Sequence, residues 1–134
     1  SFILVHNTYS NLQDIAFAQR YTDNIHWCLC PNANLYIENR LPDIDMLIKA
    51  GVKLCVGTDS LASNHQLSIM VELATIKNHY PALSWETLLR WGTNNGAQAL
   101  QLTDVVGRIA ISKKPGILHI THIDSSTPVV KRIA

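Results

Sequence analysis

Short apolar runs alternate along most of the chain with segments whose apolar residues recur at helical spacing. Three runs have the length and composition of buried strands, at residues 2–5, 25–30 and 52–57. Apolar residues at helical spacing follow them and predict helices over residues 11–21, 42–51, 65–80, 84–92 and 93–102. The polar stretch 31–40 is predicted to be irregular. This order of strands and helices predicts an α/β fold built on a parallel sheet with right-handed connections.

Capping residues set the predicted helix ends. Ser10 is expected to cap the first helix, and Pro42 is expected to open the second, which Gly51 ends. Ser84 and Thr93 are expected to cap the last two helices. The end of the chain changes character, because residues 116–124 and 127–134 resemble two strands joined by a Ser/Thr/Pro turn.

Composition narrows the classes of partner. A chain of 134 residues with a net charge of +1 gives no electrostatic reason to expect nucleic acid or a membrane surface as a partner. No apolar run approaches the roughly 18 residues of a membrane helix. The three cysteines, Cys28, Cys30 and Cys55, lie in apolar runs and are odd in number. They are predicted to be buried free thiols of a cytoplasmic protein.

Polar residues follow all three apolar strands, in "VHN", "CLCPNAN" and "GTDSLASN". Because parallel strands bring ligands to their carboxyl ends, these three tips are where the chain would build a site. An imidazole (His6) and a carboxylate (Asp59) at such tips are parts of a site that activates water on a metal. The structural alternative is that Asp59 caps the next helix and that His6 is a core imidazole.

Four segments resemble the C-terminal portion of the amidohydrolase superfamily. They are "LVHN", "CPNANLYI", "LPDIDMLIKAGVKLCVGTDSLASN", and "LLRWGTNNGAQALQL" with "GRI" following. The closest branch is the aminohydrolase and chlorohydrolase group, which acts on nitrogen heterocycles. The resemblance covers residues 3–122 and implies a (β/α)8 barrel, with these strands as its sixth, seventh and eighth. It also implies that residues 1–108 are part of the barrel and that residues 109–134 are strands of a small accompanying β-sandwich.

The resemblance assigns roles to the residues at the tips. Asp59 matches the carboxylate that ligates the metal and acts as general base. His6 matches the histidine that contacts the metal-bound water, the substrate or a second metal. Asn34 and the loop from Ser60 to Asn64 match positions that shape the substrate-binding mouth. The implied reaction is hydrolysis of a C–N or C–Cl bond of a heterocyclic substrate, with Zn or Fe as the divalent metal.

Departures from the family pattern qualify these expectations. The family's H-x-H pair and its fifth-strand histidine are missing, so we expect a C-terminal fragment that is inactive alone and binds metal weakly. Its expected partners are the rest of the barrel or a second copy of itself, because its strands leave open edges. The alternatives are a flavodoxin-like, non-catalytic binding module and a site shared with another polypeptide. Asn7, Thr8 and Tyr9 replace a second histidine that many members carry, which leaves the substrate class open.

Overall fold

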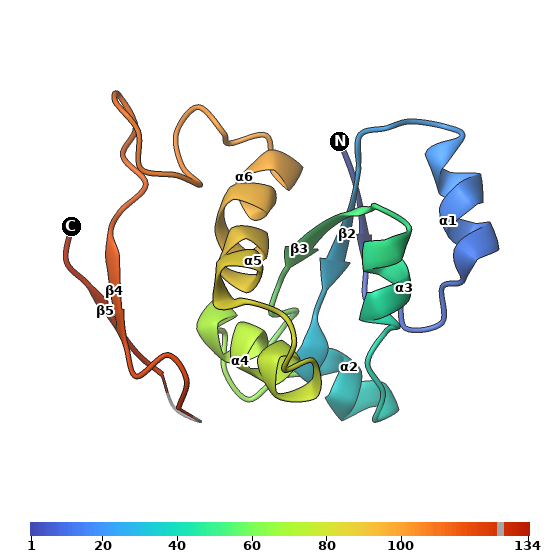
Figure 1. Cartoon of the computed structure of the whole chain (residues 1–134), viewed down its shortest axis with the longest axis horizontal. Helices are drawn as coiled ribbons and strands as arrows, with labels where there is room; N and C mark the ends of the chain where they lie inside the picture. Colours follow the sequence, from blue (N-terminus) through green and yellow to red (C-terminus); the bar gives the residue numbers. More distant parts are fainter. Residues whose placement is uncertain (126–127) are drawn as a thin grey trace.

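The computed structural model describes residues 1–125 and 128–134. Its strands form two separate sheets (Figure 1). In the first sheet the strands β1 (Phe2–Val5), β2 (Ile25–Leu29) and β3 (Lys53–Val56) are parallel and lie in chain order. In the second, β4 (Leu118–Thr121) pairs antiparallel with β5 (Val129–Arg132). All five predicted strands are confirmed. The turn predicted between the last two falls partly on residues 126–127, outside the described residues.

Helices follow each parallel strand, in the predicted order. Their bounds are α1 (Leu12–Gln19), α2 (Pro31–Glu38), α3 (Ile44–Lys49), α4 (Ile69–His79), α5 (Trp85–Arg90), the π-helical turn η1 (Trp91–Asn95) and α6 (Gly96–Ala99). Figure 1 shows α1 and α3 on one side of the strands and α4, α5 and α6 on the other side of the view. None of the helices in the described parts of the chain combines the length and apolarity needed to cross a membrane.

The first helix starts differently from the sequence prediction. Asn11, not Ser10, caps α1, because its side chain accepts hydrogen bonds from the backbone N–H groups of Gln13 and Asp14. The Asp14 carboxylate accepts from the Asn11 N–H in return at 2.9 Å, which completes a capping box. An amide followed three residues later by a carboxylate therefore decides the first residue of α1.

Pro42 does not open α3 either. Asp43 caps this helix by accepting from the backbone N–H of Met46 at 2.8 Å, so Pro42 lies just before the cap. The predicted helix over 65–80 begins only at Ile69, after the cap Ser68. A carboxylate or hydroxyl that can accept from the first-turn N–H groups fixes these starts more strongly than the apolar pattern does.

Two other predictions are wrong. The stretch 31–40 is not irregular, because α2 occupies most of it with Pro31 at its first position, where no N–H is needed. The helices predicted over 84–92 and 93–102 are not separate, since η1 joins α5 to α6 without a break. Thr93 caps nothing, because its hydroxyl donates back to the carbonyl of Leu89 at 2.7 Å.

One face of the parallel sheet carries the core. Alternate residues of β2 and β3 on this face pack against apolar side chains from the helices that follow the strands. The buried cluster contains Trp27, Leu29, Leu54 and Val56 from the strands and Ile15, Ile44, Leu47, Leu73, Ile76 and Leu88 from the helices. This packing fixes the sheet against its helices and so fixes where the strand tips lie.

The opposite face of the sheet carries His26 and the cysteines. Cys28 and Cys55 are register partners, and Cys30 lies two residues beyond Cys28 on the same face. All three cysteines are free thiols, as predicted, although Cys28 is only half-buried. The hydrogen bond from Cys30 lowers the pKa of Cys28, but the hydrogen bond to Cys55 and burial outweigh it and raise this pKa to about 12. Cys28 is therefore a neutral thiol near neutral pH.

Candidate functional site

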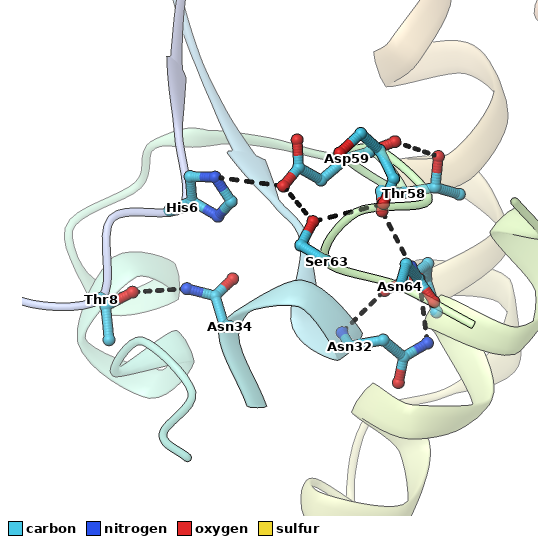
Figure 2. Close-up of polar contacts among 10 residues, drawn as sticks. His6, Thr8, Asn32, Asn34, Thr58, Asp59, Ser63 and Asn64 are labelled. Carbon is cyan, nitrogen blue, oxygen red and sulfur yellow. Dashed lines mark hydrogen bonds and ion pairs between the residues drawn. The ribbon is translucent and has the colours of Figure 1, made fainter. Parts of the chain in front are cut away.

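His6 and Asp59 meet at the carboxyl end of the parallel sheet (Figure 2). His6 directly follows β1 and Asp59 follows β3, and the His6 Nε2 lies 3.9 Å from the Asp59 Oδ2. Both side chains remain about one-third exposed, at 37% and 32%. The structure thus brings the two predicted residues to one place, where both can be reached from solvent. Their catalytic and metal-binding roles stay predictions.

The backbone is unusual at both residues. His6 has a φ of 69° and Asp59 a φ of 56°, and Asn7 beside His6 has a φ of 59°. Non-glycine residues rarely adopt this left-handed conformation, and when they do they gather at functional sites. The chain therefore accepts backbone strain at the two tips that face each other.

Neither residue fits the structural alternative. The helix that follows Asp59 begins at Ile69 and is capped by Ser68, so Asp59 caps no helix. The His6 imidazole is too exposed to be a core group. The two side chains are therefore neither a helix cap nor a core group.

A loop of small polar residues holds the Asp59 side chain. The Ser63 hydroxyl donates to the Asp59 Oδ2 at 2.5 Å, and Ser63 is itself buried. The Asn64 amide donates to the carbonyl of Thr58 at 2.8 Å, which closes the loop around Asp59 (Figure 2). Among the described residues, none donates to the Asp59 Oδ1. The sequence placed Ser63 in the loop at the mouth but did not reveal its hydrogen bond to Asp59, whose only signal was a hydroxyl four positions after the carboxylate.

The residues that were predicted to shape the substrate-binding mouth lie in different environments. Ser60 is exposed on the loop, whereas Asn64 is buried and its amide nitrogen is used within the protein. Asn34 is buried in α2, and its amide nitrogen donates to the hydroxyl of Thr8, another residue whose role the sequence did not reveal. The Asn34 Oδ1 is buried without a hydrogen-bond partner among the described residues. Such an acceptor is costly unless a ligand or water satisfies it.

The pair can supply part of a metal site. Two ligands that each lie about 2.0–2.2 Å from one Zn²⁺ are at most about 4.4 Å apart. The 3.9 Å between the His6 Nε2 and the Asp59 Oδ2 therefore fits a shared ion. In the part of the chain that the structure describes, no three His, Cys, Asp or Glu side chains gather into a metal-binding group. The donors fit a metal but are too few to hold it alone.

Known proteins match the sequence and the fold of this chain over most of its length. The model of the amidohydrolase family matches residues 1–131. A 5-methylthioadenosine/S-adenosylhomocysteine deaminase of Saccharophagus degradans is 31% identical over 87% of this chain and 27% of its own length. An adenosine deaminase from Xanthomonas campestris, solved with bound zinc, superposes with a TM-score of 0.73 at 31% identity, over 87% of this chain and 28% of that one.

A third match supports the fold alone. An atrazine chlorohydrolase from Arthrobacter aurescens, complexed with zinc, gives a TM-score of 0.73 at 24% identity, over 87% of this chain and 27% of that one. The chain thus spans about a quarter of the length of these proteins, and its α/β architecture corresponds to part of a TIM-barrel family. Together, the match over residues 1–131 and the likeness to the deaminases show that the chain belongs to the amidohydrolase family.

Proposed function

We propose that this chain is the C-terminal part of a metal-dependent hydrolase that removes an amino group from a nitrogen heterocycle. The observation that carries the proposal is the exposed pair of His6 and Asp59, 3.9 Å apart on two strained strand tips. Membership of the amidohydrolase family supports the proposal. The same membership argues against the alternative of a flavodoxin-like binding module. Deaminases among the relatives favour loss of ammonia over loss of chloride.

The proposal includes an architecture. In it, β1, β2 and β3 are the sixth, seventh and eighth strands of a (β/α)8 barrel, and residues 1–108 belong to that barrel. Residues 109–134 contribute β4 and β5 to a separate β-sandwich. Support comes from the parallel order of the first sheet and from the antiparallel pairing of the second.

A divalent metal, Zn or Fe, is part of the proposal. Asp59 and His6 would hold it together with ligands from outside this chain. When bound, such an ion lowers the pKa of water and polarises the bond under attack. Zinc in the solved adenosine deaminase supports this choice without deciding between the two metals.

The residues of this chain would handle the proton and the substrate. The Asp59 carboxylate would take a proton from the attacking water as the new C–O bond forms. It would return the proton to the leaving nitrogen as the C–N bond breaks, which releases ammonia. His6 would orient the water or the substrate from the opposite side. Asn34, Ser60 and Asn64 would shape the mouth of the substrate site.

The rest of the barrel is the partner that we propose. On the sheet face opposite the core, Ile3 and Val5 of β1 are 38% and 49% exposed. A bare apolar strand at a sheet edge needs a cover, which further barrel strands would supply. In their absence we expect the chain to self-associate, so light scattering should find a dimer or larger species, and a stable monomer would argue against this part of the proposal.

Two steps test the proposed function. First, the reading frame upstream of Ser1 should encode an H-x-H pair and a further histidine, and its absence would leave only a site shared with another polypeptide. Second, the full-length protein should contain about one bound metal and release ammonia from an adenosine-type or guanine-type substrate. Asp59→Ala should abolish this release, and full activity in that variant would overturn the proposal.

A further inference from the structure

Glu72 is the most deeply buried charged side chain near the site. It lies in the first turn of α4, is 0% exposed, and receives three N–H donors. Its Oε2 accepts from the backbone N–H of Asn32 at 2.9 Å, and its Oε1 accepts from the amide of Asn32 at 2.9 Å and that of Asn64 at 2.6 Å. A carboxylate accepts hydrogen bonds only, so it matches three converging donors. These hydrogen bonds offset the free-energy cost of burying the Glu72 carboxylate.

The donors come from two different strand tips. Asn32 belongs to the first turn of α2, which directly follows β2, and a carboxylate beside a helix N-terminus is electrostatically favoured. Asn64 belongs to the loop after β3, and the same amide nitrogen that reaches Glu72 also donates to the carbonyl of Thr58, next to Asp59. Through these hydrogen bonds Glu72 links the Asp59 loop, residues 58–64, to the first turn of α2.

We infer that Glu72 is a positioning residue, which holds the Asp59 loop in its strained conformation through Asn64. The inference rests on the proposed function for its catalytic consequence, but its structural part stands on the contacts alone. A residue with a φ of 56° needs surrounding contacts that outweigh its strain. The Asn64 amide supplies such a contact on the amino-terminal side of Asp59, because it donates to the Thr58 carbonyl and is itself held by the buried Glu72 carboxylate. The Ser63 hydroxyl supplies the contact to the side chain itself.

Two variants remove this anchor, and a third serves as a control. Glu72→Gln keeps the shape but turns an NH2 group toward amide donors, so at least one donor loses its acceptor. Asn64→Ala cuts the link to the loop and leaves the contacts between Glu72 and Asn32. Thr75→Val is the matched control, because it removes the 2.7 Å hydrogen bond from Thr75 to the Asn32 Oδ1 on the far side of the network.

The experiment measures amide hydrogen exchange over residues 58–64 and steady-state deamination in the metal-loaded, full-length protein. Both anchor variants should speed exchange in this loop at least tenfold, while exchange in α4 stays close to that of the parent. Both should lower kcat at least thirtyfold with metal content changed less than threefold, and Glu72→Gln should change KM less than threefold. Thr75→Val should change loop exchange and kcat less than threefold.

Each outcome decides the inference. If loop exchange and kcat of Asn64→Ala match those of Thr75→Val, Glu72 is a structural residue only and the inference is wrong. If Glu72→Gln does not fold, Asn64→Ala still overturns the inference when its loop exchange and kcat match those of Thr75→Val. If the parent protein releases no ammonia, the proposed function fails, whereas loop exchange in the same three variants continues to test the anchoring.

Discussion

The two strand tips that meet at the site are held in different ways. The tip after β1 is held by neutral contacts: the His6 N–H donates to the carbonyl of Cys28 at 3.0 Å, and the Asn7 amide donates to the carbonyl of Leu4 at 2.8 Å. The tip after β3 is closed by Asn64 and anchored on the buried carboxylate of Glu72. Both tips contain left-handed residues, but only the second is tied to a charged group inside the fold.

This difference suggests a division of labour between the two residues. A group that must take and return a proton at a fixed point needs a rigid position, because small misplacements cost much of the rate. Asp59 has that rigidity from Ser63 and from the Glu72 anchor. A group that orients water or substrate needs no such anchor, and the tip that carries His6 is held by neutral hydrogen bonds alone. The predictions below test this division, from the largest expected effect to the smallest.

Replacing Asp59 should have the largest effect. Asp59→Asn keeps the size of the side chain and an acceptor for the Ser63 hydroxyl, but it removes the proton acceptor. We expect kcat of the full-length protein to fall about 10³-fold, within the range for loss of a general base. Single-turnover and steady-state ammonia release would measure it. A variant within tenfold of the parent would show that Asp59 does not carry the proton.

Replacing His6 should have a smaller effect. His6→Asn is the suitable variant, because asparagine tolerates the left-handed backbone that His6 adopts and alanine does so less well. We expect kcat/KM to fall about 30-fold, since orientation by one hydrogen bond is worth less than the proton transfer. Measured beside Asp59→Asn, a loss as large as that of the carboxylate would contradict the division of labour.

The hydrogen bond between Thr8 and Asn34, at the tip after β1, should affect the stability of the protein more than its kcat. Thr8→Val removes the hydroxyl that accepts from the buried Asn34 amide, so the amide loses its partner. We expect the free energy of unfolding to fall by about 1–3 kcal/mol, the cost of a buried unsatisfied donor. Urea unfolding checks this, with Thr8→Ser as the control that keeps the hydroxyl. Equal stability of Thr8→Val and the parent would mean that water replaces this contact.

The smallest effect concerns His26, on the sheet face below the tips. Burial, then the charge of Lys53, lower the pKa of His26 from its ordinary 6.5. The unfolded chain therefore binds the proton more readily, and stability should fall as pH drops below about 6.5. Thermal unfolding between pH 8 and pH 5 should show this slope, reduced in His26→Asn. An unchanged slope in that variant would assign the effect to other groups.

Much of the fold follows from local patterns in the sequence. The three apolar runs ended where polar residues began, and parallel pairing then required His6 and Asp59 to reach the same edge. That part needed only strand propensity and the rule for parallel sheets. The free thiols followed in the same way from their place within apolar runs.

What the sequence did not reveal depends on long-range contacts. The helix α2 was missed because Pro31 and two asparagines are typical of a loop, and its first free N–H is satisfied by Glu72, 40 residues away. The contacts of Ser63, Thr8 and Glu72 were missed for the same reason, since nothing local distinguishes these residues from surface polar residues. Asn64 was predicted at the mouth, but its role as an anchor emerges only when Thr58 and Glu72 are placed around it.

The most direct test of the central claim is diffraction by crystals of the full-length protein at the zinc absorption edge. We predict an anomalous peak about 2.0–2.2 Å from an Asp59 carboxylate oxygen, with the His6 Nε2 as a second ligand or within hydrogen-bonding reach of one. If the protein holds zinc elsewhere, or if Asp59 has no ion beside it in crystals grown with saturating zinc, the two strand tips do not form a metal-hydrolase site.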